Sequence, residues 1–122
     1  MFYTSSMKIA IEITTKDRNL TSWLLGDPKT LRVGETKVEI PNGDAALVFE
    51  GEEFRKAGID LPRVVEFSLT LGTAVGSGVV ANWLWDKLKG RQITAITIDK
   101  TSVEFEEGQV KKIVTERISM KK

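Results

Sequence analysis

Alternating apolar and polar residues predict strands in two parts of the chain. Residues 7–14 carry Met or Ile at every second position, and a period of two with β-branched residues is typical of a half-buried strand. Residues 93–99 and 102–106 alternate in the same way. A tight turn around Lys100 and Thr101 predicts that these two segments form a hairpin.

The middle of the chain predicts two shorter strands. Residues 37–40 alternate between charged and apolar positions, and residues 45–49 are mostly apolar. Asn42 and Gly43 stand between them, and this pair favours a tight turn. Residues 52–58 are then predicted to form a single helical turn that ends at a glycine.

Two further segments have the spacing of amphipathic helices. In the first, Leu20, Trp23 and Leu24 recur at helical spacing, Asp17 can cap the beginning, and Gly26 can end the helix. The second covers the C-terminal region, where residues at i, i+3, i+4, i+7 and i+8 share one face. That face consists of Val110, Ile113, Val114, Arg117 and Ile118.

Residues 67–85 contain no charged side chain and place three glycines among apolar residues. Their length is close to the roughly 20 residues of a membrane-spanning helix, so a membrane-associated module is one interpretation. Against it, several Ser and Thr residues and Asn82 lower the hydrophobicity, and Glu66 and Asp86 bound the segment closely. The segment is also the best partner for the apolar faces of the other predicted elements, so we do not favour a membrane location.

The same segment matches part of a dinucleotide-binding motif. Gly76 and Gly78 have the spacing G-x-G-x-x-G/A, and Asp99 follows 23 residues after the first glycine. In such sites the glycines let backbone amides approach a pyrophosphate, and the acidic residue binds ribose hydroxyls. However, four residues separate the strand-like run from the first glycine, and a second half of a dinucleotide fold is missing. A small nucleotide-binding domain is therefore the less favoured alternative.

We favour a long glycine-rich helix that packs closely against the rest of the fold. On a helix, Gly72 and Gly76 lie at i and i+4, and Gly78 stacks in the same way on a small alanine. Another backbone can then approach this helix closely. The packing gained must offset the loss of about 0.5–1 kcal/mol of stability that each interior glycine causes relative to alanine. Residues 64–72 fit both a strand and the beginning of this helix, so their structure stays open.

Two tryptophans near the end of this segment are candidate contact residues. Trp83 and Trp85 would lie about 200° apart on a helix, so they cannot both face the core. We predict that one of them is partly exposed or lies in an interface, where Trp is a favoured anchor. The alternative is that a loop covers it. Lys87 completes this candidate interaction site.

The composition restricts the chemistry of the protein. Lys and Arg number 18 against 17 Asp and Glu, a net charge of +1 that gives no general attraction to nucleic acid. His and Cys are absent, which removes the usual general base, thiol nucleophiles and the commonest metal ligands. The carboxylates form only loose groups without a convergent pair. We therefore expect no catalytic site, no cofactor and no metal, and a cytoplasmic location without a signal peptide.

The predicted order of elements is that of an α+β domain. We expect a mixed or antiparallel sheet of about four to five strands, packed by the long glycine-rich helix and the C-terminal amphipathic helix. A chain of 122 residues is long enough for one such domain. We assign residues 7–122 to this domain and residues 1–6 to a flexible N-terminal extension.

Three motifs follow one another along the chain in the order of a known family. They are Ser22, Trp23 and Leu24 with Asp27; Gly72 to Trp85, with Leu84 and Lys87; and the strand pair and following acidic residues at 93–107. In this order the chain from Met7 onward resembles the effector-associated constant components, small domains of bacterial conflict systems. A strand-rich insert over residues 30–51 departs from the family pattern.

This resemblance implies a non-catalytic companion of effector or protease-like proteins, which acts as an adaptor or sensor through protein contacts. We accordingly predict a protein-interaction module, with an immunity-like component as a variant of the same hypothesis. Its partner would be an effector or toxin-like protein, and a homo-oligomer is compatible with the sequence. The contact residues would be Trp83, Trp85 and Lys87.

Overall fold

The computed structural model describes residues 7–26, 29–53 and 63–121 of the chain. The predicted N-terminal extension at 1–6 and most of the predicted helical turn at 52–58 lie outside these ranges. The elements, in chain order, are β1 (Lys8–Thr15), α1 (Leu20–Leu25), β2 (Lys37–Ile40), β3 (Ala45–Glu53), β4 (Arg63–Leu71), α2 (Ser77–Leu88), β5 (Ile93–Ile98), β6 (Thr101–Val103) and α3 (Glu107–Lys121).

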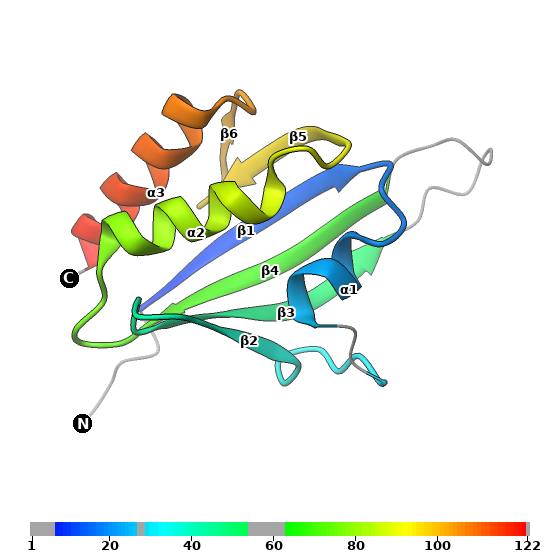
Figure 1. The fold of residues 1–122 in the computed structure, drawn as a ribbon, viewed down its shortest axis with the longest axis horizontal. Coiled ribbons are helices and arrows are strands. Elements are labelled where there is room, and N and C mark those ends of the chain that lie inside the picture. The colour runs from blue at the N-terminus through cyan, green and yellow to red at the C-terminus, as the bar shows by residue number, and fades with distance from the viewer. Residues whose placement is uncertain (1–6, 27–28, 54–62, 122) are drawn as a thin grey trace.

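Within the described residues, six strands form one antiparallel sheet, and three helices lie over one of its faces (Figure 1). The strands stand in the order β2-β3-β4-β1-β5-β6. The predicted α+β class is thereby confirmed, and the sheet is antiparallel rather than mixed. Both predicted hairpins are present, β2 with β3 and β5 with β6. The turn of the second lies at Asp99 and Lys100, both with positive φ, one residue earlier than predicted.

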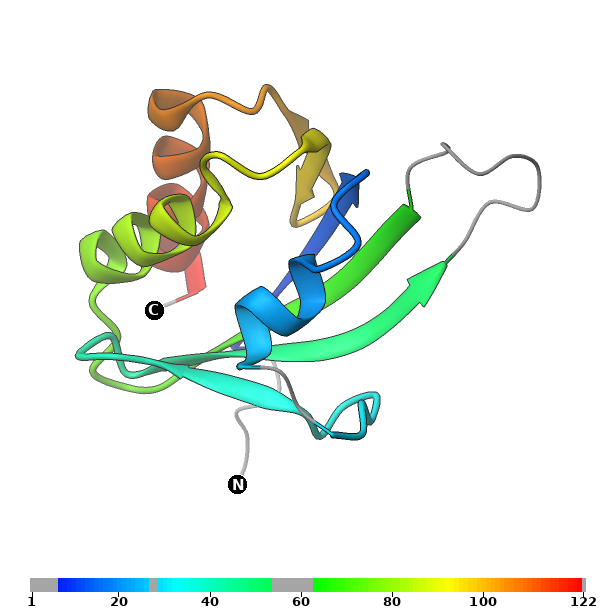
Figure 2. The same cartoon turned by 45° about the vertical axis from the view of Figure 1, so that its right-hand side comes forward.

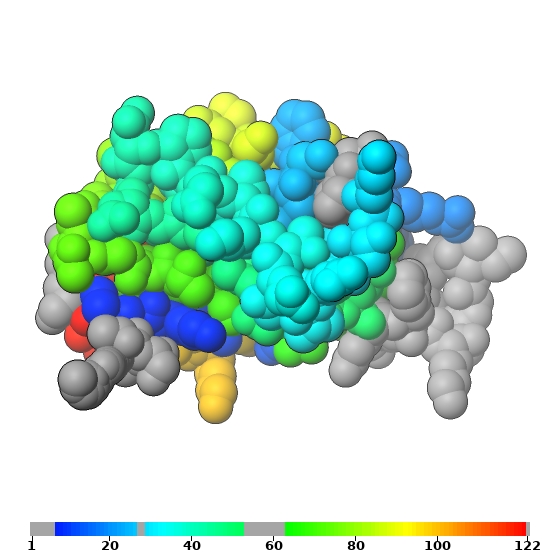
Figure 3. Space-filling view, turned by 90° about the horizontal axis from the view of Figure 1, so that it is seen from below, coloured from blue at the N-terminus to red at the C-terminus, as the bar shows by residue number. Residues whose placement is uncertain are grey.

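The period-two pattern places one face of the sheet in the core and leaves the other uncovered. On the central strand β1, Ile9, Ile11 and Ile13 are fully buried, whereas Lys8 and Glu12 are exposed. None of the helices in the described residues covers the opposite face of the sheet, which Figure 3 shows from below. One polar and one apolar face are the expected form of an antiparallel sheet covered on one side.

All three helices lie on the same side of the sheet (Figure 2), and each contributes apolar residues to one core. On each helix the buried residues recur mainly at i and i+4, so they form a single stripe toward the sheet. The stripes include Leu20 and Leu24 on α1, Val80, Leu84 and Leu88 on α2, and Val110, Val114 and Ile118 on α3. The predicted C-terminal amphipathic helix is confirmed by α3.

The predicted long glycine-rich helix is not confirmed, and residues 64–72, whose structure the sequence left open, do not belong to a helix. Residues 63–71 are strand β4, and the helix begins only at Ser77. Buried and partly exposed side chains alternate along β4, and its backbone pairs with β1 on one side and β3 on the other. This additional strand raises the sheet from the expected four or five strands to six, because pairing on both sides favours the extended backbone over a helix.

The glycines assigned to helix packing consequently have different roles. Gly72 lies in the loop after β4, where an added Cβ would collide with the carboxylate of Asp44. Gly76 precedes the first turn of α2, and its N–H donates to the carbonyl of Gly43 at 3.1 Å. Gly78 is helical, but an added Cβ there would meet nothing within 4 Å. Only Gly72 permits a close approach, and what approaches is the β2–β3 turn rather than a helix.

Candidate functional site

The end of the sheet where β1 ends and β5 begins carries an exposed tryptophan. Trp23 on α1 is 45% exposed, whereas Trp83 and Trp85 on α2 are half-buried. α1 buries Leu20 and Leu24, and its other side faces outward with Trp23. A large aromatic side chain held at the surface is a feature of protein interfaces.

Trp23 is fixed by contacts with the C-terminal end of α2. Its indole Nε1–H donates to the carbonyl oxygen of Lys87 at 2.7 Å. The guanidinium carbon of Arg91 stands 4.1 Å from the centroid of the Trp23 ring, and Nζ of Lys87 stands 4.9 Å from it. The same Nζ lies 5.8 Å from the ring of Trp83. We call these four residues, Trp23, Trp83, Lys87 and Arg91, the tryptophan cluster.

The end of α2 positions both cations of the tryptophan cluster. Lys87 occupies the last turn of the helix, where a positive charge is favourable to the helix dipole. Gly90 follows with a φ of +79°, a left-handed conformation that glycine adopts at low cost. The chain turns there, so that Arg91 returns over the Trp23 ring. Cations over aromatic faces contribute roughly 0.5–1 kcal/mol each at exposed positions.

Asp17 orients Arg91 from the connection between β1 and α1. The two side chains form an ion pair with 2.9 Å between Nη1 and Oδ2, and the Asp17 side chain is only 13% exposed. Burial by itself would raise the pKa of Asp17. The N–H of Asn19, the hydrogen bond from Arg91 and the charges of Arg91 and Arg63 outweigh burial and lower this pKa below its ordinary value of 3.8. The carboxylate is therefore ionised and holds Arg91 in place at neutral pH.

Arg63 supports the same connection from beneath. Its Nη2 donates to the carbonyl oxygens of Asp17 at 3.1 Å and Arg18 at 2.6 Å. Its Nη1 lies 3.4 Å from Oε1 of Glu52, and the same oxygen accepts a hydrogen bond from Thr21 on α1. Residues from β3, β4 and α1 thus fix the backbone at Asp17. The Asp17 carboxylate in turn fixes the position of Arg91.

The structure brings together two of the three predicted contact residues. Trp83 and Lys87 lie one helical turn apart and share the tryptophan cluster. Trp85 lies on another side of α2, against Phe105, with 4.9 Å between the ring centroids. The two tryptophans therefore do face different directions, although both are half-buried.

Sequence reasoning missed Trp23 as a surface residue, because its spacing with Leu20 and Leu24 placed it on the core side. The buried face of α1 is defined instead by two pairs at i and i+4, Leu20 with Leu24 and Thr21 with Leu25. When Thr21 and Leu25 are counted with Leu20 and Leu24, the middle of the buried face of α1 lies farther from Trp23 around the helix. A helical wheel with both pairs is the signal that could have placed Trp23 at its border.

The elements of the dinucleotide alternative are not arranged as in such a site. β4 and β5 flank α2 in sequence, yet β1 lies between them in the sheet. The carboxylate of Asp99 stands 3.5 Å from Arg117, and the N–H of Gly76 is bound to Gly43. A dinucleotide site needs adjacent parallel strands with free amides at the helix N-terminus.

The described residues provide neither a metal site nor a membrane-spanning helix. No group of three acidic side chains among residues 7–26, 29–53 and 63–121 is placed to hold a metal ion. None of the helices in these ranges combines the length and the apolar character that crossing a bilayer requires.

Comparison of the chain with protein-family models, with curated proteins and with solved structures found no match.

Proposed function

We propose that this protein is a non-catalytic interaction module whose partner protein docks on the tryptophan cluster. The observation that supports the proposal is the exposed ring of Trp23, held against Lys87 and Arg91 by a hydrogen bond to the backbone of α2. Trp and Arg are the residues that most often dominate the energy of protein interfaces. The cluster is already ordered, so little conformational entropy is lost when a partner binds.

The charge of the cluster indicates what the partner presents. Arg91 is paired with Asp17, but within the described residues no carboxylate forms an ion pair with Lys87. An acidic side chain of the partner can pair with this ammonium while an apolar neighbour covers the exposed ring of Trp23. We therefore propose an acidic protein surface as the partner.

The biological setting of the proposal comes from the sequence alone. The resemblance to the effector-associated constant components favours an adaptor, sensor or immunity-like role in a bacterial conflict system. The partner would then be an effector or toxin-like protein. This setting rests on the motif order at residues 22–27, 72–87 and 93–107, and the interaction site rests on the tryptophan cluster.

The proposal is tested by affinity capture from the cells that produce the protein, followed by binding measurements with the purified partner. Trp23→Ala and Lys87→Glu each change one member of the cluster. We expect each to weaken binding by about tenfold or more, as for central interface residues. High salt should weaken the native complex, because it screens the attraction between Lys87 and the acidic partner. It should not weaken the Lys87→Glu complex, in which that attraction is replaced by a repulsion that salt also screens.

Trp85→Phe is the matched control, because it changes a tryptophan of the same helix outside the cluster. It should leave binding unchanged within about twofold. If the partner binds Trp23→Ala and Lys87→Glu as tightly as the native protein, the tryptophan cluster is not the interaction site. Circular dichroism of each variant shows whether the fold is retained.

A further inference from the structure

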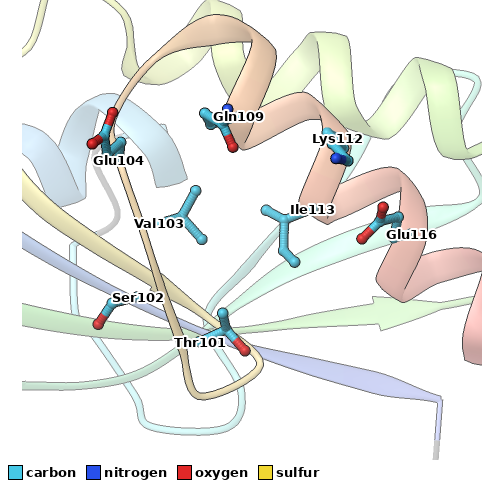
Figure 4. A pocket seen from close by; sticks show the side chains of 8 residues that line it. All are labelled: Thr101, Ser102, Val103, Glu104, Gln109, Lys112, Ile113 and Glu116. Carbon is cyan, nitrogen blue, oxygen red and sulfur yellow. The ribbon is translucent and has the colours of Figure 1, made fainter.

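A groove of about 450 Å³ lies between β6 and α3, separate from the tryptophan cluster. Val103 and Ile113 are its half-buried apolar residues, and polar side chains surround them (Figure 4). A volume of this size is typical of sites that bind a small ligand or a few side chains of a peptide. The remaining lining residues are Thr101, Ser102, Glu104, Gln109, Lys112 and Glu116.

One wall of the groove is an edge strand with a free hydrogen-bonding side. β6 pairs with β5, and within the described residues no strand pairs with its outer side. The two-residue turn makes Ile98 and Thr101 a hydrogen-bonded pair, so the next residue, Ser102, belongs to a pair without hydrogen bonds. The N–H and C=O of Ser102 therefore point away from the sheet, toward the place of an added strand.

The side chains of β6 show that the groove lies on the helix-covered side of the sheet. Val103 pairs with Ile96, whose side chain is in the core, so Val103 points to the helix-covered face. Ile113 of α3 lies on the other side of the space (Figure 4). An extended segment paired with Ser102 would place every second side chain between Val103 and Ile113.

The width of the groove is held by Arg117 of α3. Its Nη2 donates to Oγ1 of Thr101 at 3.0 Å, and its Nε lies 3.5 Å from the carboxylate of Asp99. These contacts tie the β5–β6 turn to the last half of α3. The groove is consequently formed in advance, which lowers the entropy cost of binding.

The end of the groove where α3 begins is acidic. Glu104 lines it, and Glu106 stands beside Glu104. A hydrogen bond to Glu104 and the charge of Glu104 raise the pKa of Glu106, which is the expected effect of two neighbouring carboxylates. Within the described residues neither carboxylate has a cation at ion-pair distance, whereas Glu107 is paired with Lys111. A basic side chain at this end would relieve the repulsion.

We propose that the groove binds an extended peptide segment of a partner protein, which adds to the sheet beside β6 and places a Lys or Arg next to Glu104. Strand addition at a sheet edge is a recurrent mode of peptide recognition, in which main-chain hydrogen bonds give affinity and pockets for alternate side chains give specificity. The basic charge of the peptide distinguishes this surface from the tryptophan cluster, whose proposed partner is acidic. A module with both surfaces can join two different partner segments.

The test is an NMR titration of the ¹⁵N-labelled protein with two synthetic hexapeptides. Both alternate valine and threonine, and one begins with two lysines while the other begins with two glutamates. We expect the lysine peptide to shift amide signals of β6 and α3 and to bind about tenfold more tightly than the glutamate peptide. A lysine peptide with N-methylated threonines should bind about tenfold more weakly. When the valines of an antiparallel segment face Val103 and Ile113, the threonines lie opposite the outward groups of Ser102, and their N–H groups can no longer donate to it.

Two proline variants test the edge strand itself. Ser102→Pro removes an outward N–H of β6, and Glu39→Pro removes an outward N–H of β2, the strand at the opposite edge. Proline is tolerated where the N–H of an edge strand faces solvent. Ser102→Pro should weaken the lysine peptide by about tenfold, and Glu39→Pro by less than about twofold.

Several outcomes would overturn the proposal. They are shifts confined to other elements, no shifts up to millimolar peptide, equal binding of the lysine and glutamate peptides, and equal binding of the N-methylated peptide. Shifts of the β6 amides with protein concentration alone would show that a second copy occupies the edge. If Ser102→Pro does not fold, the N-methylated peptide still decides whether main-chain pairing takes place. Failure of this test leaves the proposal on the tryptophan cluster intact, because the two surfaces share no residue.

Discussion

The two ends of the sheet are closed in different ways. At one end, the β2–β3 turn and the loop before α2 are joined by main-chain groups, with Gly72 N–H donating to the carbonyl of Asp44 at 2.8 Å and Gly76 N–H to that of Gly43. At the other end, Trp23, Lys87 and Arg91 close the fold through side chains. We call the first the glycine junction.

The difference is the reason for proposing the tryptophan cluster, and not the glycine junction, as the binding surface. At the glycine junction the polar groups that meet are used within the fold, including the Asp44 carboxylate, which accepts the N–H of Ala74 at 2.8 Å. At the tryptophan cluster, Trp23 stays 45% exposed beside two cations. The first arrangement uses its polar groups for stability, and the second leaves accessible the aromatic residue on which we propose that a partner docks.

The largest effect is expected at the glycine junction. Gly72→Ala places a Cβ where the Asp44 carboxylate lies, so the carboxylate must move and lose its hydrogen bond with Ala74. We expect the free energy of unfolding to fall by about 2 kcal/mol, measured by urea denaturation.

Asp44→Gly is the control for this substitution. Asp44 has a φ of +50°, which glycine adopts readily, and its removal frees the space next to Gly72. In the Asp44→Gly background, Gly72→Ala should cost less than about 0.5 kcal/mol, because only interacting sites depart from additivity. An equal cost in both backgrounds would show that the carboxylate is not what excludes a side chain at Gly72.

A smaller effect, dependent on pH, is expected beneath the tryptophan cluster. Asp17→Asn removes the charge that holds Arg91 and should lower the free energy of unfolding by about 1 kcal/mol at pH 7. The pKa of Asp17 is lowered in the folded protein, so the unfolded state binds the proton more readily. The contribution of Asp17 is therefore complete above its ordinary pKa of 3.8 and is lost as the pH falls through the lower folded value.

The measurement for Asp17 is urea denaturation of the native protein and Asp17→Asn at pH 7, 5 and 3. The difference between them should be constant from pH 7 to 5 and smaller at pH 3. A difference that grows as the pH falls would contradict the lowered pKa. Glu12→Gln, on the exposed face of β1, is the control for loss of a carboxylate elsewhere.

The smallest effect is a gain in stability next to the glycine junction. Gly78 is exposed in the first turn of α2, and an added Cβ would meet no atom within 4 Å. Gly78→Ala should raise the free energy of unfolding by about 0.5–1 kcal/mol through helix propensity. Thermal denaturation of Gly78→Ala and Gly72→Ala, measured side by side, should show a gain in stability for the first variant and a loss for the second. A loss of stability in Gly78→Ala would show that this position, too, needs glycine.

Strands with a strict period of two were predictable, as β1 and the hairpin of β5 and β6 show. Residues 63–71 were not, because their period fitted a strand and a helix equally and only pairing with β1 and β3 decides between them. Trp83 and Lys87 were predicted because both belong to one local segment, the end of the glycine-rich stretch. Trp23 and Arg91 were missed, because they reach the site from other elements far away in sequence.

The sequence by itself determined the α+β class, the amphipathic α3 and the absence of His and Cys, since these follow from local periodicity and composition. The tertiary structure alone decided the strand order, the role of Gly72 and the meeting of Trp23 with Lys87 and Arg91. Each of these depends on contacts between residues distant in the chain. Such contacts are set by how strands distant in sequence pair and by how the helices cover the sheet. A local pattern predicts a hairpin between neighbouring strands, but it carries no information about these distant contacts.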